Sequence, residues 1–460
     1  MKRFAWQWVV VSSILLIPSA KAETRPQYGG TLRVAMREAP VSLDPVLGGA
    51  DATRSDSFAQ RNLLALIFET LVNMDDRGRL YPGLATDWQA APGNQRWQFW
   101  LRRGVRFHDG VPLTAEIAAS SLRTANPSWK VFTEGDSVIV ERDKADPDLP
   151  AELALTRNSI LKRNSGGKLN GTGPFHIEDW LPGKKLILVA EEEHWRGRAF
   201  VDKIEVEMGR NFREQLVELE AGKADLVEVA PEQGHRVTME GRRVSTSQPM
   251  ELVALVFAGD AQTPDEKLLR HALAESLERN SMRSALLQGA GQPAASILPN
   301  WMSGYGFTFS SDADLDRARH ERAQVRSAPN WTVGYDANDS VARLLVERIA
   351  LNAMDAGLAL QPTSLATAGL RLVRLPLDMA DPWIALSKAA GILGMAMPKR
   401  SGDTVEGLYS TERELLAGQR MIPLFHLPAE WASTPTLRDW KPGADGSSRL
   451  DDSWMRKEQP

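Results

Sequence analysis

The sequence predicts an α/β protein with a β-sheet in each of two lobes. Strand-like and helix-like segments alternate along the chain, without a fixed repeat period or a low-complexity tract. The 460 residues are too many for one hydrophobic core, and a chain of this length usually forms roughly two or three domains. The hydrophobic share of 43% and the charged share of 25% are ordinary for a globular protein.

The N-terminal third contains the first predicted strands and helices. Residues 31–36 and 97–101 read as strands, the former because its apolar and polar residues alternate. The apolar stretch at 62–72 suits a buried helix, and Thr114 stands as the N-cap of a helix that continues to Arg123.

Two further helices have clear beginnings. Thr263-Pro264-Asp265-Glu266 has the spacing of a capping box, with proline at the first helical position. Its predicted buried face consists of Leu268, Leu269, Ala272, Leu273, Ser276 and Leu277. The second helix runs from a cap at Asp339 or Ser340 to Gly357. Its predicted buried face consists of Val341, Leu344, Leu345, Ile349 and Ala353.

Strand-like segments flank these helices and complete the α/β pattern. They lie at residues 185–189, 203–208, 253–257, 331–335 and 370–375.

The N-terminus has the three parts of an export signal. Lys2 and Arg3 are followed by an apolar stretch at 9–17 and by Ser19-Ala20-Lys21-Ala22, so we expect a signal peptide at 1–22, cleaved near Ala22/Glu23. The apolar stretch is too short to span a membrane, which argues against the alternative of an uncleaved anchor. We expect a periplasmic protein that is soluble after cleavage.

Charge and cysteine content narrow the possible partners. Without residues 1–22, which contain three basic residues and no acidic one, the net charge of −4 becomes −7. This mild acidity argues against nucleic acid and anionic lipid as partners. The absence of cysteine excludes a lipid-anchored N-terminal Cys, disulfides and thiol catalysis.

Motifs of enzymatic chemistry are missing. There is no H-E-x-x-H, G-x-S-x-G or phosphate-loop pattern, and no two of the seven histidines lie three to five residues apart. The glycines at 166–173 read as a plain connection. Asp378 and Asp381 could form a carboxylate pair, but before Pro382 they look more like a turn or a helix start. We expect no catalytic residue, no metal site and no cofactor; a secreted hydrolase built from distant carboxylates stays open as an alternative.

Nine segments, in order along the chain, carry a family resemblance. They are GGTLRV at 29–34, SLDP at 42–45, IFETLV at 67–72, LYPGLA at 80–85, VRFHDGVPLTA at 105–115, GTGPF at 171–175, EHWRG with VDKI at 193–204, LRHALA at 269–274 and IPLFH at 422–426. In this order the chain resembles the family-5 extracellular solute-binding proteins, the peptide- and nickel-type receptors of ABC importers.

The resemblance implies a two-lobed periplasmic-binding-protein fold of type II, in the large peptide-binding subclass. Its first lobe would be discontinuous, comprising residues 23–57, 172–258 and 422–460. A small inserted subdomain, abridged between Ala115 and Gly171, would span 58–171, and the second lobe 259–421. A hinge would let the lobes close around the ligand.

The resemblance also implies ligand-binding residues. Asp378-Met379-Ala380-Asp381-Pro382 is similar to the segment that holds the α-amino group of peptides, which gives Asp378 that role. The alternative is that Asp378 merely ends a strand and caps the next element. Trp383 could pack on the ligand or in the core, and Gly49, Ala50 and Asp51 would line the cleft.

The leading hypothesis is therefore a monomeric periplasmic receptor without catalytic activity. It would capture a peptide or similar small solute and deliver it to an ABC importer permease in the inner membrane. A receptor for a nickel chelate or another non-peptide solute is the nearest alternative.

Overall fold

The computed structural model describes residues 25–46 and 58–456, apart from residues 165, 340, 366, 378, 380, 401, 403 and 445. The expected signal peptide and its cleavage site lie outside this part of the chain. Among the described residues, no helix combines the length and the apolar content needed to span a bilayer.

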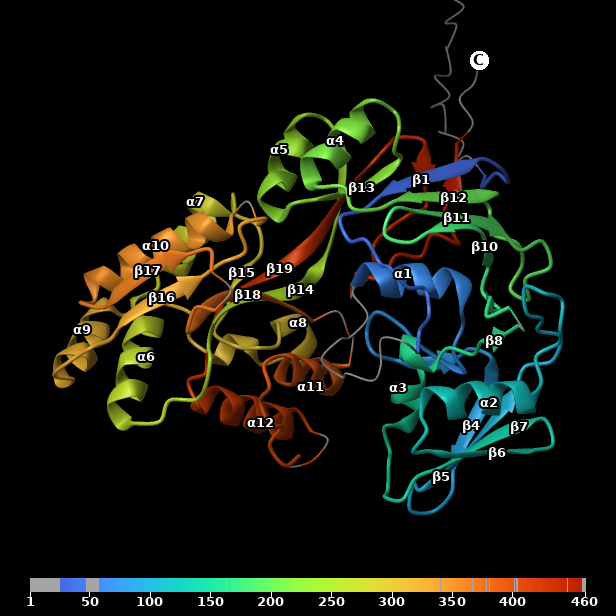
Figure 1. The fold of residues 1–460 in the computed structure, drawn as a ribbon, viewed down its shortest axis with the longest axis horizontal. Helices are drawn as coiled ribbons and strands as arrows, with labels where there is room; N and C mark the ends of the chain where they lie inside the picture. Colours follow the sequence, from blue (N-terminus) through green and yellow to red (C-terminus); the bar gives the residue numbers. More distant parts are fainter. Residues whose placement is uncertain are drawn as a thin grey trace, which may run out of the picture.

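One large mixed sheet runs through the molecule (Figure 1). Its strand order is β10-β11-β12-β1-β13-β19-β14-β18-β16-β17, with β15 paired to β19. The strands are β1 (Thr31–Ala35), β10 (Phe175–Leu181), β11 (Lys185–Ala190), β12 (Lys203–Glu207), β13 (Leu226–Val229), β14 (Arg243–Phe257), β15 (Gln292–Pro293), β16 (Asn330–Gly334), β17 (Ala359–Thr363), β18 (Leu370–Pro376) and β19 (Met421–Ser433). The sequence predicted one sheet per lobe; the two sheets are continuous instead, because β14 and β19 take part in both.

The antiparallel pair β14 and β19 crosses from one lobe to the other. At one end, residues 243–246 of β14 pair with the part of β19 that also pairs with β13. At the other end, residues 251–257 pair with β18 as well as with β19. Between these ends the register shifts on both sides of Pro249, which has no N–H to donate to the ladder. The two lobes are thus joined by strands whose pairing is interrupted between them.

The first lobe is the part around β1 and β10–β13. Helix α1 (Phe58–Ile67) packs on one face of the sheet, where its Leu64 and Ile67 share a core with Phe175. Helices α4 (Phe212–Glu220) and α5 (Gly234–Met239) pack on the other face, with Leu219 and Val237 in a separate core.

The second lobe is the part around β16–β18 and the adjoining ends of β14 and β19. Alternate residues of β14 point to opposite faces, so Val253 and Leu255 join one core and Leu252 and Ala254 the other. The first core is covered by α6 (Pro264–Ser276), α7 (Arg279–Leu286), α9 (Leu315–Gln324) and α10 (Ala342–Asp355). The second is covered by α8 (Asn300–Ser303), α11 (Pro382–Ile392) and α12 (Val405–Ala417).

A small subdomain with its own core lies beside the first lobe (Figure 1). Its four-stranded antiparallel sheet has the order β4-β5-β7-β6. Its elements are β2 (Val72–Met74), β3 (Leu80–Pro82), β4 (Ala85–Ala90), β5 (Arg96–Leu101), α2 (Ala115–Ala125), β6 (Lys130–Glu134), β7 (Ser137–Glu141) and α3 (Leu149–Leu153). Short pieces complete the chain: η1 (Thr156–Asn158), β8 (Lys162–Arg163), β9 (Leu169–Asn170), η2 (Pro231–Gln233), η3 (Gly306–Thr308), β20 (Leu437–Arg438) and β21 (Trp454–Met455).

The predicted caps at Thr114 and Thr263 and the helix stop at Gly357 are confirmed, but α10 has its N-cap at Val341 instead of Asp339 or Ser340. The carboxylate of Asp339 accepts hydrogen bonds from the N–H groups of Val341 and of Ala342, the first residue of the helix. The side chain of Thr114 accepts a hydrogen bond from the N–H of Ile117, and that of Thr263 accepts one from Glu266. Gly357 follows α10 in the left-handed conformation, with φ of 76°.

Two other local predictions were wrong. The helix predicted to reach residue 72 ends at Ile67, because the backbone from Glu69 onwards pairs with residue 160 and with the strand segment after Gly83. Leu344 was predicted to lie on the buried face of α10, but its side chain is 48% exposed. The buried face of this helix is instead centred on Leu345, Val346 and Ile349.

Candidate functional site

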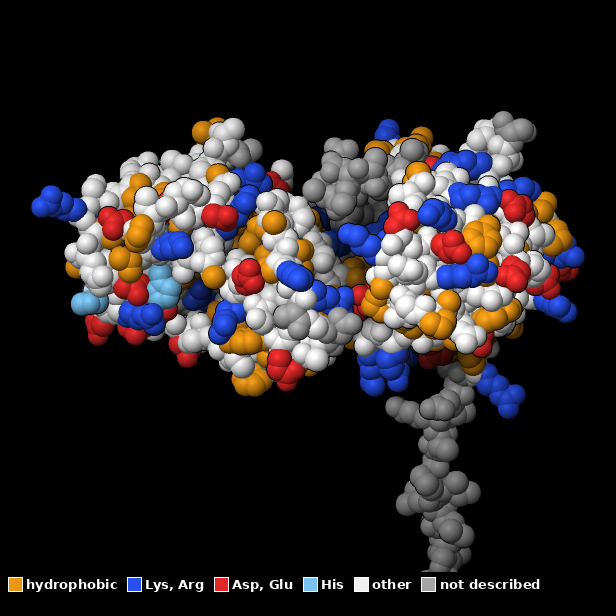
Figure 2. Space-filling model, turned by 90° about the horizontal axis from the view of Figure 1, so that it is seen from below, with side chains coloured by type: hydrophobic (Ala, Val, Ile, Leu, Met, Phe, Trp, Pro, Cys, Tyr) orange, Lys and Arg blue, Asp and Glu red, His pale blue; other side chains and the backbone are white. Residues whose placement is uncertain are grey.

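The molecule is hollowed between its two lobes, and basic side chains are visible in the hollow (Figure 2). In the ribbon, α1 and α3 face α8 and α11 across this space, below the crossing strands β14 and β19 (Figure 1). We call the space the cleft, with α1 and α3 on one wall and α11 with residues 395–400 on the other.

Two contacts between side chains bridge the cleft. Arg61, on α1, directs its Nη1 to the Sδ of Met379 at 3.1 Å. Arg400, beyond α11, forms an ion pair with Asp148, the residue that precedes α3. Each contact joins residues more than 250 positions apart in the sequence. The walls therefore touch at two places in this structure.

Trp383 links the second wall to its core. Its side chain packs against the buried cluster that contains Leu377, Ala385 and Leu386. The guanidinium of Arg400 lies over its ring, 4.3 Å from the centroid. Trp383 is thus half-buried against the core and also supports a charged group at the cleft.

Asp381 acts as the N-cap of α11. Its Oδ1 accepts a hydrogen bond from the N–H of Ile384 at 2.9 Å, and Pro382 occupies the first helical position. Burial raises the pKa of the Asp381 carboxyl, and the nearby carboxylate of Asp148 adds to this effect while Arg400 opposes it. Asp381 therefore starts a helix, in agreement with the interpretation of this segment as a turn or helix start.

The other predicted binding residues cannot be placed. Asp378, Gly49, Ala50 and Asp51 all lie outside the described residues. Next to Asp378, Leu377 is fully buried and Met379 contacts the opposite wall. Sequence reasoning missed Arg61, Asp148 and Arg400, since no motif or periodicity connects them.

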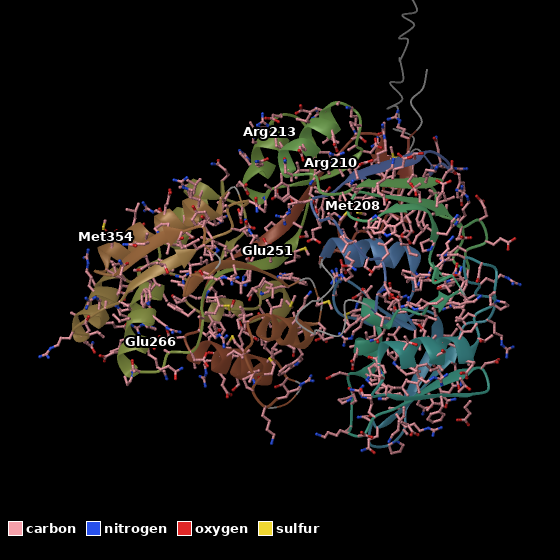
Figure 3. The ribbon with its side chains drawn as sticks, viewed as in Figure 1. Met208, Arg210, Arg213, Glu251, Glu266 and Met354 are labelled. Carbon is pink, nitrogen blue, oxygen red and sulfur yellow. The ribbon has the colours of Figure 1, made fainter. Side chains whose placement is uncertain are left out.

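A network of half-buried charges fixes the crossing strands on the side of the second lobe. Arg374 on β18 donates to Glu251 of β14 and to Asp339 before α10, at 2.6 Å each. Burial disfavours the charge on Arg374, but the two carboxylates outweigh this effect and raise the pKa of the guanidinium. Glu251 lies near the middle of the molecule, whereas Met354 lies at the outer edge of the second lobe (Figure 3).

The interrupted part of β14 has side-chain support as well. Trp301 of α8 donates its indole N–H to the carbonyl of Pro249 at 2.6 Å. Ser247 accepts a hydrogen bond from the N–H of Ala429, on β19, at 3.0 Å. These bonds replace ladder bonds that the register shifts remove.

Three of the family-like segments meet around the carboxylate of Glu69. It accepts hydrogen bonds from the hydroxyl of Thr172 and the indole of Trp195, both at 2.9 Å. Gly171 and Gly173 pass so close to residue 67 that added Cβ atoms would lie 1.9 and 2.6 Å from its backbone atoms. The glycines therefore allow close packing between backbone segments, in keeping with a plain connection.

Among the described residues, no three His, Asp or Glu side chains are grouped so that they could hold a metal ion. Three histidines do lie near this junction: His108 contacts the carbonyl of Gly173 at 3.1 Å, His176 pairs with Glu191 at 2.6 Å, and His194 lies 3.6 Å from Glu69. Each has a protein partner that accounts for its position.

Residues 79–380 match the family described as bacterial extracellular solute-binding proteins, family 5 Middle. The nickel-binding protein NikA of Staphylococcus aureus is 24% identical over 243 residues, which are 50% of this chain and 49% of that protein. The uncharacterized protein YhjP of Bacillus subtilis is 34% identical over 181 residues, 36% of this chain and 30% of that protein. The matches thus span half or less of these relatives' lengths.

Solved structures share the fold over almost the whole chain. The periplasmic binding protein DppA of Helicobacter pylori, in complex with the peptide STSA, gives a TM-score of 0.78 at 18% identity, covering 94% of this chain and 99% of that chain. NikA of Staphylococcus aureus, in complex with Ni(L-His)2, gives 0.75 at 15% identity, covering 93% and 100%. The fold is therefore that of the two-lobed periplasmic binding proteins, and the match to more than half of its residues shows that the chain belongs to the bacterial extracellular solute-binding proteins of family 5.

Proposed function

We propose that this protein captures a peptide or similar small solute between its two lobes in the periplasm and delivers it to an ABC importer in the inner membrane. The observation that carries the proposal is the cleft itself, with polar and aromatic side chains on walls that belong to different lobes. Ligand contacts with both walls favour a closed state, which a transporter can distinguish from the open one. The peptide bound to the Helicobacter pylori structure supports this ligand class.

The domain boundaries form part of the proposal. We assign residues 23–57, 172–258 and 422–460 to lobe I, 58–171 to the inserted subdomain and 259–421 to lobe II. The separate sheet β4-β5-β7-β6 supports the subdomain. Packing suggests two refinements: α1 shares the core of the first lobe, and the ends of β14 and β19 nearest β18 pair within the second.

We assign the α-amino group of the ligand to Asp378, and contacts along it to Trp383, Gly49, Ala50 and Asp51. The supporting observation is that Met379 and Asp381, which follow Asp378 in the same segment, both lie at the wall of the cleft. We further propose cleavage before Glu23, a monomeric state and no catalysis. Membership of a family of binding proteins argues against the hydrolase alternative.

Native mass spectrometry of the mature protein tests this function. Protein from the periplasm, with and without added di- to pentapeptides, should show a bound peptide and a rise in melting temperature. The absence of both with every peptide pool would contradict the proposal. Asp378→Asn should weaken binding of free-amine peptides selectively; an equal loss for N-acetylated peptides would remove the proposed role of Asp378.

A nickel chelate is the second candidate ligand, favoured by the similarity to NikA with Ni(L-His)2. The two candidates differ in what is released when the purified protein is denatured. Elemental analysis would detect nickel for a chelate receptor, and peptide sequencing by mass spectrometry would identify the cargo of a peptide receptor.

A further inference from the structure

We propose that Arg400 and Asp148 form a clasp across the mouth of the cleft, which excludes long extended peptides and selects short ligands. This proposal rests on the proposed function and names a specificity-determining pair for it.

The two partners come from different parts of the fold. Asp148 belongs to the small subdomain and immediately precedes α3, whereas Arg400 belongs to the second lobe. α3 and α11 face one another on the side of the cleft away from the crossing strands (Figure 1). The ion pair therefore spans the opening where the walls are free to separate.

Asp148 is available for this contact. It occupies the N-cap position of α3, yet its side chain makes no capping hydrogen bond there and is bonded to Arg400 instead. The helix behind it is firmly seated, since Leu149, Ala151 and Leu153 are buried. The carboxylate is thus held at a fixed place on the wall.

Arg400 is held on the opposite wall by Trp383. The position of its guanidinium over the face of the indole limits its rotamers, which reduces the ordering required when it meets a carboxylate. Trp383 packs in turn against the core of the second lobe. Asp148 is therefore positioned by the buried residues of α3, and Arg400 by Trp383, which packs against the core of the second lobe.

The clasp affects the length of the ligand that fits between the walls more than it affects folding stability. An ion pair this exposed, with side-chain exposures of 34% and 51%, contributes little to folding stability. Together with the contact between Arg61 and Met379, it brings the walls together at two places. Since an extended peptide adds roughly 3.3–3.6 Å per residue, a long one would have to pass between these groups and separate them.

A series of peptides of the same composition, from dipeptide to octapeptide, tests in the mature protein whether the clasp selects ligands by length. Dissociation constants would be measured by calorimetry for the wild type, Arg400→Ala, Asp148→Ala and the charge-exchanged Arg400→Asp/Asp148→Arg. Arg103→Ala is the matched control, because Arg103 and Asp136 form an exposed pair within the small subdomain, at 2.9 Å.

The wild type should bind short peptides and discriminate against long ones. Both alanine variants should gain about tenfold in relative affinity for the long peptides, and the exchanged pair should restore the discrimination, whereas Arg103→Ala should not alter it. Equal loss of affinity at all lengths, or no change, would overturn the clasp as a length selector and leave the proposed function standing. Failure of the wild type to bind any peptide would overturn both proposals.

Discussion

The two lobes are connected in two physically different ways. At the crossing of β14 and β19 the connection is covalent and supported by half-buried charges, with Arg374 between Glu251 and Asp339. At the mouth it is an exposed ion pair between Arg400 and Asp148. The side chains at the crossing are 15–30% exposed and share one cation between two carboxylates, whereas those at the mouth are 34% and 51% exposed and exchange their partner for water more readily. The crossing is thus suited to keep its geometry while the mouth opens and closes.

The largest expected effect comes from removing the cation at the crossing. Arg374→Ala leaves the half-buried carboxylates of Glu251 and Asp339 without their shared partner, and we expect a loss of roughly 2–3 kcal/mol in the free energy of unfolding. Urea denaturation measures this change. Arg343→Ala, which removes an exposed pair with Glu347 on α10, is the control and should leave stability almost unchanged. Similar losses in the two variants would contradict the contrast between half-buried and exposed pairs.

The stability of the protein should depend on pH through Glu412, which holds the segment that contains Trp301. Glu412 is fully buried. It accepts hydrogen bonds from the N–H groups of Ile297 and Leu298, which precede Trp301, and from the hydroxyl of Tyr305, which follows it. Burial raises the pKa of Glu412 to about 7, from an ordinary value near 4.5. Between these values the folded state keeps a proton that the unfolded state has lost. The contribution of this group to stability is therefore present below pH 4.5 and is lost as the pH rises to 7.

Comparison with Glu412→Gln isolates this contribution. The stability of the wild type relative to the variant should fall by about 2 kcal/mol between pH 4.5 and 7, measured by urea denaturation at several pH values. The comparison matters because burial also lowers the pKa of His426 to about 4, and this group has the opposite sign: its contribution is lost as the pH falls below 6.5. A difference between wild type and variant that does not vary with pH would contradict the assignment.

A smaller effect is expected at the interrupted part of β14. Trp301→Phe keeps most of the ring but removes the hydrogen bond to the carbonyl of Pro249, at a cost of about 1 kcal/mol. Amide hydrogen exchange should locate the change: protection should fall on both sides of Pro249 in β14 and remain in β4–β7. Uniform loss of protection over the molecule would show that Trp301 has no particular role at the crossing.

The smallest effect on stability is expected at the mouth. Arg400→Ala should change the free energy of unfolding by no more than about 0.5 kcal/mol, yet should alter the separation of the walls. Because the chain has no cysteine, dyes can be attached uniquely to Arg103→Cys in the small subdomain and Val405→Cys in the second lobe, both exposed. Fluorescence energy transfer should fall when Arg400 is replaced; an unchanged value would mean that the pair does not hold the mouth.

Much of the fold could be predicted because its signals are local. Thr114, Thr263 and Gly357 mark helix ends through bonds or backbone angles within a few residues, and strands such as 185–189 are recognisable by composition. Leu344 shows the limit of such reasoning. A helical pattern offers several apolar residues near one face, and only the packing of α10 selects those that are buried.

The sequence by itself determined the fold class, the helix ends at Thr114, Thr263 and Gly357, and the family, since each depends on residue order or on contacts between near neighbours. Only the tertiary structure decided that Glu69 joins Thr172 and Trp195, that β14 and β19 unite two sheets, and that Arg400 meets Asp148. These contacts join residues more than 100 positions apart, and they arise from the packing of whole elements. A charged side chain carries no local signal of its distant partner, so the cleft contacts became visible only in the folded chain.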